Sequence, residues 1–389
     1  MNTLPDHNGS QKRIHSIDAV RALALLGILL VHCGCCFGAL PQGVENECVW
    51  GGVDRCVSLL IHCFMSGRAR LAFSFLFGLS FFLQMDHAAA KGIDFRKRFC
   101  WRLLLLLGFS FFHNLFYPHD ILTDFVFCGF ILVLVWKLKT WAIVAFSLVC
   151  LSSPVSLWEY CSGNEGVFSA WCSSVRDSLT IYPSPSLADP SLAEHMKWNA
   201  VHAQMMTLFV DLQGSLFAIL GMFLLGMTAG RLRIFEGNPR LLLRIAACGF
   251  VLWAAACLFH IGFVRDSLRN SEFRSPEWWS WWLREIWVFF FIPMTAWIFS
   301  HEAVLKRCSC LTAIGRCTLS CYITQGIALS WFFYDWGLGM HSRMGATDRF
   351  LIGLAVYAVQ LAACTLWLRH FKYGPLEGVW RRLTRIGMK

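Results

Sequence analysis

Long apolar runs recur from one end of the chain to the other, and short polar segments separate them. A helix of about 20 apolar residues spans the hydrocarbon core of a bilayer, so this pattern predicts an all-α, polytopic integral membrane protein. The predicted membrane-spanning segments are about 18–40, 69–85, 100–117, 120–136, a fifth that ends near 157, 207–229, 245–264, 285–300, 313–333 and 350–368. We therefore expect about ten transmembrane helices in a single domain, 1–389.

The charged residues between these segments alternate in sign along the chain. An excess of basic residues lies in the N-terminal segment 1–17, in the connections 86–102, 137–140, 231–244 and 302–312, and in the tail 372–389. The connections at 41–67 and 158–200 carry acidic residues instead. Because basic connections stay in the cytoplasm, both termini are expected to be cytoplasmic and 158–200 is expected to be an external loop. The predicted location is the bacterial inner (cytoplasmic) membrane.

The composition supports the same class of protein. Of the 389 residues, 57% are hydrophobic and 15% are charged, whereas about 25% of the residues of soluble proteins are charged. The net charge of +10 is concentrated in the cytoplasmic connections, so it indicates membrane topology and excludes a nucleic-acid partner. The expected partner of the chain is the lipid bilayer.

The first predicted span carries two polar groups that an apolar helix cannot hide in lipid. Arg21 and His32 are eleven positions apart, which places them within about 20° of one helix face and about 16 Å apart along the axis. One stripe of this helix is therefore expected to face a protein interior or a wet cavity. Arg21 is either an interfacial anchor or a cation for an anionic ligand, with Asp18 one turn earlier to orient it. His32 is either a packing residue or a general base.

A denser polar group lies between the third and fourth predicted spans. His113, His119, Asp120 and Asp124 occur within twelve residues, and the two aspartates lie one turn apart on one helix face. One interpretation is a solvated helix N-terminus, where carboxylates are favoured. The alternative is that paired His and Asp side chains of this group handle protons at the membrane face.

Three further polar residues are weaker candidates for substrate binding. Arg68 opens the second predicted span, and Tyr322 and Gln325 lie one turn apart in the ninth. Amides and phenols inside a membrane also join helices by hydrogen bonds, so both roles stay open for Tyr322 and Gln325.

The chain has 18 cysteines, most of them within apolar runs, where a thiol packs as a small hydrophobic group. Their spacing does not match a zinc site, so no metal is predicted. The pairs Cys48/Cys56 and Cys161/Cys172 fall in segments expected outside the cytoplasm, where disulfides are allowed but cannot be assigned from sequence.

Several sequence blocks, in order, resemble the YeiB-like bacterial membrane proteins, which carry a domain of unknown function numbered 418. The blocks are 16–29, Phe73–Gly78, His113 through Asp120-Ile121-Leu122, Leu220–Gly226, Gly315-Arg316 with Tyr322 and Gln325, 367–369, and Gly374-Pro375-Leu376-Glu377. His119 stands where the family usually has glycine, and Cys321 where asparagine is common. The resemblance extends over nearly the whole chain and adds Arg316 to the candidate substrate-binding residues.

That family resembles, more distantly, the acyltransferase-three-type membrane enzymes, which carry Arg, ten residues, then His on the first helix. Arg21 and His32 match this spacing. The resemblance implies an O-acyltransferase that moves an acyl group from cytoplasmic acyl-CoA, a co-substrate and not a bound cofactor, to a hydroxyl of a glycan or lipid-linked envelope component. His32, Arg21, His113 and Asp120 are the expected catalytic residues. The alternatives are a transporter or flippase for a polar or anionic solute and a non-catalytic membrane protein.

Overall fold

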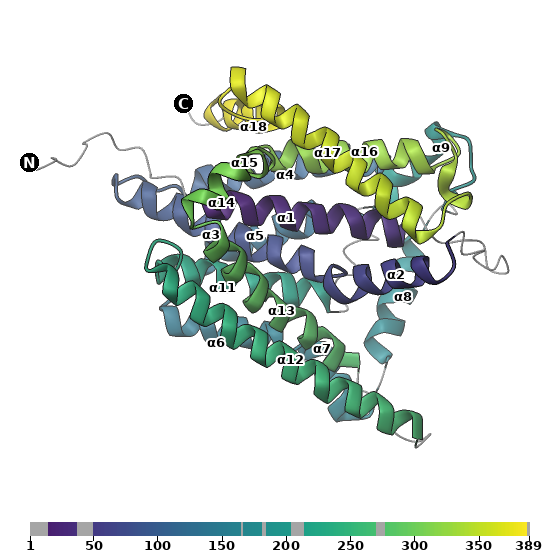
Figure 1. Cartoon of the computed structure of the whole chain (residues 1–389), viewed down its shortest axis with the longest axis horizontal. Coiled ribbons are helices and arrows are strands. Elements are labelled where there is room, and N and C mark those ends of the chain that lie inside the picture. The colour runs from purple at the N-terminus through teal and green to yellow at the C-terminus, as the bar shows by residue number, and fades with distance from the viewer. Residues whose placement is uncertain are drawn as a thin grey trace, which may run out of the picture.

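The computed structural model describes residues 15–36, 50–164, 166–180, 184–203, 214–269 and 277–386, and every element in these ranges is a helix (Figure 1). The predicted all-helical class is confirmed for this part of the chain. In chain order the elements are α1 (His15–Val31), η1 (His32–Cys36), α2 (Gly52–Phe64), α3 (Arg68–Ala89), α4 (Arg96–Phe116), α5 (Leu122–Val135), α6 (Thr140–Leu151), α7 (Pro154–Ser162), α8 (Val167–Leu179), α9 (Leu192–Trp198), η2 (Asn199–Ala203), α11 (Ser215–Arg231), α12 (Pro239–Arg269), α13 (Glu277–Ile298), α14 (Glu302–Arg307), α15 (Ser309–Arg316), α16 (Thr318–Phe333), η3 (Met340–Ser342), α17 (Ala346–His370) and α18 (Pro375–Ile386).

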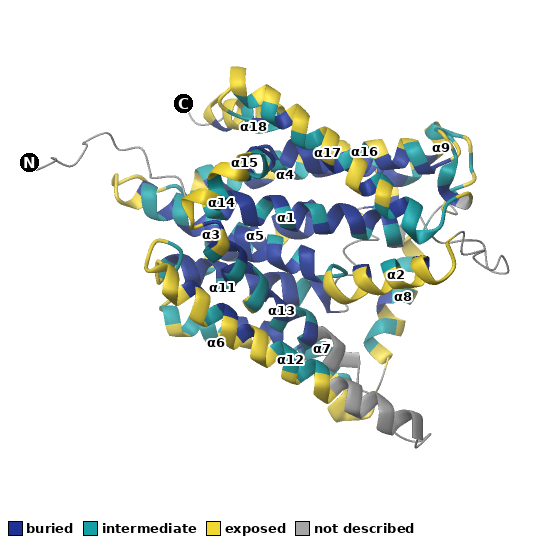
Figure 2. Ribbon diagram, in the orientation of Figure 1, coloured by how far each residue is buried: buried dark blue, intermediate teal, exposed yellow. Residues whose placement is uncertain are grey.

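Helix α1 lies at the centre of the bundle, in contact with α3, α13, α15 and α17 (Figure 1). Figure 2 shows α1 buried along most of its length. The expectation of a single inward-facing stripe is therefore too narrow, because other helices surround α1 on nearly every side. A helix that is apolar all round is typical of a protein core or of a membrane span. Tyr357 of α17 fixes α1 from one side by donating a hydrogen bond of 2.9 Å to the carbonyl of Ala22.

Helices α3 and α11 form the most extensive contact of the bundle, and glycines bring their backbones together. A Cβ atom placed on Gly78 of α3 would lie 1.9 Å from the carbonyl oxygen of Phe223, and one on Gly226 of α11 would lie 1.9 Å from that of Phe75. Gly226 and Gly230 form a G-x-x-x-G motif, the spacing that lets membrane helices approach closely.

The helix lengths are those of a membrane protein. Among the described residues, five helical segments are long and apolar enough to cross a bilayer, and six if α6 and α7, which meet at a bend of 55°, count as one span. The five are His15–Gly34, Gly52–Ala89, Arg96–Phe116, Pro239–Phe259 and Ala346–His370. Each of the ten predicted spans overlaps a helix of the described residues, but some are short, such as α5 with 14 residues.

The segment 158–200, expected as a loop, is largely helical where it is described, because it contains α8, α9 and the end of α7. Its end packs on the bundle: Asn199 donates a hydrogen bond of 3.0 Å to the carbonyl of Leu115 at the end of α4. Cys161 and Cys172 are free thiols, and Cys48 of the other candidate pair lies outside the described residues.

The basic tail forms the amphipathic helix α18, which lies across the first turns of α4 and α16. The indole N–H of Trp380 donates to the carbonyl of Arg102 at 3.1 Å. Glu377 caps α16 from outside: its Oε1 accepts from the backbone N–H of Leu319 at 2.7 Å, and its Oε2 from the Ser320 hydroxyl at 2.6 Å. A carboxylate at this position also complements the helix dipole.

We predict that Gly226→Ala destabilises the protein by about 1–3 kcal/mol, because the added methyl group would force α3 and α11 apart. Gly108→Ala is the matched control, since a Cβ there has no neighbour within 4 Å and alanine favours the helix. Thermal unfolding in one detergent compares the two variants, and equal unfolding temperatures would contradict the proposed packing.

Candidate functional site

Asp120 is the centre of a buried polar cluster that joins α4, α16 and the turn before α5. Its Oδ1 accepts a hydrogen bond of 3.0 Å from the Tyr322 hydroxyl and lies 3.0 Å from Nδ1 of His113. Its Oδ2 accepts from the Ser110 hydroxyl, which also lies 2.7 Å from the hydroxyl of Thr123. Three side chains therefore hold one carboxylate inside the bundle, as burial of a charge requires.

Asp120 and Asp124 are both fully buried. The interpretation of these residues as a solvated helix N-terminus is therefore wrong. The physical reason is that α4 and α16 cover this turn, as the bonds from His113 and Tyr322 to Asp120 demonstrate. The alternative prediction was a paired His and Asp, and the structure pairs His113 with Asp120.

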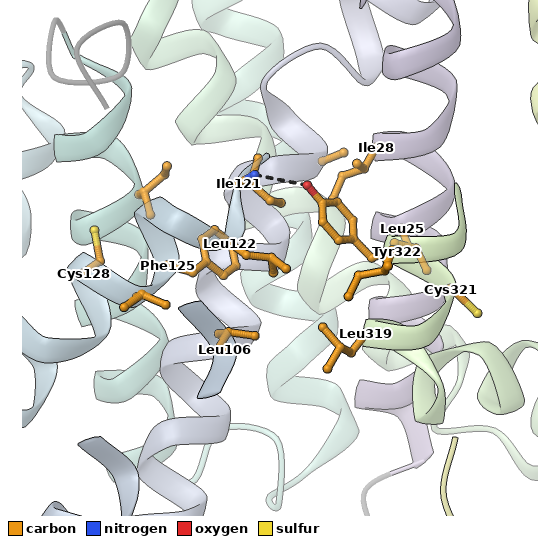
Figure 3. Close-up of a cluster of buried hydrophobic side chains, with 14 of the residues drawn as sticks. Leu25, Ile28, Leu106, Ile121, Leu122, Phe125, Cys128, Leu319, Cys321 and Tyr322 are labelled. Carbon is orange, nitrogen blue, oxygen red and sulfur yellow. Dashed lines mark hydrogen bonds between the residues drawn. The ribbon is translucent and has the colours of Figure 1, made fainter. Parts of the chain in front are cut away.

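Tyr322 completes the cluster with a second hydrogen bond. Its hydroxyl accepts from the backbone N–H of Ile121 at 3.1 Å (Figure 3). The hydroxyl therefore donates to one residue of the turn and accepts from the next. Around it, Leu25, Ile28 and Leu319 form the apolar surroundings drawn in Figure 3. This enclosure keeps competing water away from the two bonds.

His113 is held on both sides of its ring. Nδ1 faces Asp120, while Nε2 faces Gly326 of α16 so closely that a Cβ atom on this glycine would lie 2.1 Å away. Nε2 has no hydrogen-bond partner among the described residues. His113 is therefore positioned as part of the bundle core and packed against α16.

His32 is buried where α1 passes into the short π-helix η1. Its ring lies 4.9 Å from that of Tyr117 and 6.4 Å from that of Tyr322, measured between centroids. The structure thus brings together four residues predicted from sequence, namely His32, His113, Asp120 and Tyr322. Local π-helical turns often occur at functional positions.

Arg21 lies at the opposite end of α1, beside Asp18 and α3. Its guanidinium is 2.9 Å from Oδ1 of Asp18 and donates to the Ser80 hydroxyl at 2.5 Å. Helix α15 approaches α1 here because Gly315 has no side chain: a Cβ atom would lie 2.0 Å from the Asp18 carbonyl oxygen. This close approach brings Arg316 into the same region.

An inner cavity of about 260 Å³ extends from Arg21 to Tyr322. Phenylalanine and leucine side chains of α3, α4 and α5 form one part of its wall, and polar and basic side chains form another. The cavity shares Arg21, Ser80, Gln84, Arg102, Arg316 and Arg381 with a larger outer vestibule of about 1160 Å³. The two spaces therefore meet at a ring of mostly basic side chains.

Basic residues outnumber acidic ones around the outer vestibule. Its charged lining residues are Arg21, Lys91, Arg98, Arg102, Arg233, Arg316, Lys372 and Arg381 against Asp18, Asp86 and Glu236. The guanidinium of Arg102 lies 4.2 Å from the centroid of the Trp380 ring, and Arg316 donates to the carbonyl of Lys372 at 2.8 Å. The vestibule is thus an electropositive concavity.

Two predicted substrate-binding residues lie away from both spaces. Arg68 is buried at the start of α3, where it donates to the carbonyls of His62 at 3.0 Å and Ser66 at 3.4 Å. Gln325 donates to the side chain of Gln360 on α17 at 2.7 Å. The observed contacts of both side chains stabilise the packing of helices and turns.

Tyr117 is a central residue that sequence reasoning missed. It is fully buried, and its ring lies 5.6 Å from those of His113 and His119 in addition to its contact with His32. The signal was Pro118: the residue before a proline is disfavoured in helices, and Tyr117 indeed adopts φ −140°, ψ 108° and ends α4. This turn folds Asp120 back toward His113.

Sequence reasoning also missed three residues that line the inner cavity, Arg102, Trp380 and Arg381. A basic stretch or an amphipathic tail has the same sequence pattern whether its side chains face water or line a cavity. As to metals, no group of three His, Cys, Asp or Glu side chains in the described part of the chain is suited to hold an ion.

We predict that Tyr322→Phe lowers the free energy of unfolding by about 1–3 kcal/mol, because it leaves the buried Ile121 N–H without an acceptor and Asp120 without one donor. Tyr160→Phe is the control, since Tyr160 is exposed. Denaturant titration in mixed micelles measures both variants. Unchanged stability of Tyr322→Phe would show that the two hydrogen bonds contribute nothing net.

Comparison with known proteins shows what the chain is similar to. Residues 227–387 match the family described as "Protein of unknown function (DUF418)". The chain is 28% identical to "Uncharacterized protein YxaH" of Bacillus subtilis (strain 168), covering 97% of this chain and 95% of the relative. It is 26% identical to "Uncharacterized protein YeiB" of Escherichia coli (strain K12), covering 95% of each. The C-terminal part of the chain therefore matches the DUF418 family, and nearly the whole chain is similar to YxaH and YeiB.

Proposed function

We propose that the protein is a transmembrane acyltransferase that moves an acyl group from cytoplasmic acyl-CoA to a hydroxyl of a sugar or another envelope component. One observation carries the proposal: a single apolar cavity leads from a ring of arginines to Tyr322, whose ring lies next to His32. An acyl-CoA has the matching chemistry, with phosphates at one end and an apolar group at the other.

The basic vestibule suits the phosphates of the donor. Arg21, Arg102, Arg316 and Arg381 line both spaces, and guanidinium groups bind phosphate through paired hydrogen bonds. Arg21 and His32 are about 16 Å apart along α1, so the thioester of the donor cannot contact both side chains. Arg21 therefore binds the donor's phosphates and does not polarise the thioester carbonyl.

His32 is the candidate general base. Its imidazole takes the proton of the acceptor hydroxyl as the hydroxyl oxygen attacks the thioester carbonyl carbon. A carbon–oxygen bond forms, the carbon–sulfur bond breaks, and the imidazolium returns the proton to the departing CoA thiolate. The products are an ester and CoA with a free thiol, so neither oxidant nor reductant is consumed.

His113, Asp120 and Tyr322 act as positioning residues in this proposal. Both oxygens of Asp120 are bonded to protein groups, and His113 Nε2 is packed against Gly326. These residues therefore hold the turn before α5 against α16 beside the reacting groups. Tyr322 is also one of the residues that line the inner cavity.

The topology that fits this function is ten spans in one domain, both termini in the cytoplasm, within the bacterial inner membrane. The vestibule would then open to cytoplasmic acyl-CoA, because it is lined by the start of α1 and by α18. The acceptor, a glycan or a lipid-linked component, would reach His32 from the other end of α1.

A second candidate is a transporter or flippase for a polar or anionic solute. The observation that favours it is the 55° bend between α6 and α7, because broken helices surround the substrate in many transporters. Those proteins carry a broken helix in each of two matching halves, whereas one such pair occurs in the described residues.

We predict saturable binding of acetyl-CoA to the purified protein, weakened at least about tenfold by Arg21→Ala, the equivalent of about 1.4 kcal/mol. Isothermal calorimetry in lipid nanodiscs measures the affinity, which is expected to fall with added salt. Arg96→Ala is the control, because Arg96 pairs with Asp94 on the surface outside both spaces. Absence of CoA binding would favour the transporter.

We predict that His32→Ala lowers acyl transfer by at least about a hundredfold without loss of folded protein. Radiolabelled acetyl-CoA added to inverted membrane vesicles reports transfer into the envelope fraction. His301→Ala serves as the control, because His301 is exposed between α13 and α14. Full transfer by His32→Ala would rule out His32 as the base.

A further inference from the structure

One face of α18 packs against the bundle. Leu376 and Trp380 contact the hydrophobic core, and Thr384 is buried. The indole N–H of Trp101 on α4 donates a hydrogen bond of 3.2 Å to the carbonyl of Leu383. Figure 2 shows exposed residues along α18, so this packing leaves the other faces of the helix uncovered.

An exposed apolar stripe lies next to the packed face. Val379, Leu383 and Ile386 are 44%, 38% and 70% exposed. At about 100° per residue, the three positions lie within about 60° of one another around the helix. We call these three residues the α18 stripe.

Basic side chains follow the α18 stripe on the side of the helix opposite Trp380. Arg382 and Arg385 are exposed there, and both lie outside the inner cavity and the outer vestibule. The one acidic residue of α18, Glu377, is bonded to the start of α16. The exposed part of α18 is therefore apolar along one strip and positively charged along the next, as in helices that lie in a membrane interface.

The position of α18 in the chain places it near a membrane surface. Helix α17 is long and apolar enough to span a bilayer, and residues 371–374 alone connect it to α18 (Figure 1). At this end of α17 the exposed rings of Trp367 and Phe371 stack 4.2 Å apart. Aromatic side chains are enriched where a span meets the headgroups, so α18 begins close to that level.

We propose that α18 is an interfacial helix that binds the anionic phospholipids of the adjacent leaflet. The α18 stripe enters the boundary of the acyl chains, and Arg382 and Arg385 bind phosphate oxygens of the headgroups. A second copy of α18 on this face would bring two sets of arginines together, whereas anionic headgroups neutralise them. The proposal does not depend on the proposed acyltransferase function.

The test is hydrogen–deuterium exchange of the full-length protein in two kinds of nanodisc. One contains phosphatidylcholine alone, and the other contains equal parts of phosphatidylcholine and phosphatidylglycerol. The amides of α18 are expected to exchange more slowly with phosphatidylglycerol, and added salt should reduce the difference. Each arginine at an anionic surface contributes a factor of about five. Arg382→Gln combined with Arg385→Gln should therefore remove up to about 25-fold of this protection.

Lys306→Gln combined with Arg307→Gln is the matched control. It removes the same charge from exposed positions of α14 and should leave α18 exchange unchanged. Val379→Gln combined with Ile386→Gln tests the α18 stripe, because glutamine keeps the helix favourable but does not enter the leaflet. This variant should exchange faster in α18 in both nanodiscs, while unchanged exchange in α1 shows that the bundle is folded.

Three results would overturn the proposal. The first is equal α18 exchange in the two nanodiscs, with or without the two arginines. The second is wild-type exchange in the variant that removes the α18 stripe. The third is protection that follows the dimer content measured by light scattering, because a second copy would then cover the stripe. Absence of CoA binding would leave this proposal standing, since Arg382 and Arg385 lie outside the proposed donor site.

Discussion

The structure depends on how one carboxylate is satisfied inside an apolar bundle. Asp120 accepts hydrogen bonds from Ser110, His113 and Tyr322, which come from α4 and α16. A buried charge without such partners costs several kcal/mol. Separation of α4 from α16 would remove these partners from Asp120 and is therefore unfavourable. The same bonds fix the turn at Ile121 that begins α5 and borders the inner cavity.

The inner cavity connects the polar cluster around Asp120 with the basic vestibule. Between them, phenylalanine and leucine side chains of α3, α4 and α5 line the inner cavity. At the vestibule, α18 contributes the Trp380 ring beneath the Arg102 guanidinium and the Glu377 cap on α16. The last helix of the chain thereby completes a site that begins with Arg21 on the first.

Close backbone contacts give this arrangement its rigidity. Gly78 and Gly226 allow α3 and α11 to touch, Gly315 allows α15 to reach α1, and Gly326 leaves room for the ring of His113. In a membrane, packing of this kind replaces much of the hydrophobic driving force that stabilises soluble proteins. Helix α3, several of whose residues line the inner cavity, is therefore packed closely against α11.

The apolar runs by themselves determined the helical class, the regions that contain helices and the candidate functional residues. An ionisable group within an apolar run is rare and can be recognised without knowledge of the tertiary structure. His32, His113, Asp120 and Tyr322 were found in this way. Only the tertiary structure decided that these four residues meet and that Arg68 and Gln325 lie elsewhere. Tyr322 is about 200 positions from Asp120 in the chain, and local periodicity contains no information about which distant helices pack together.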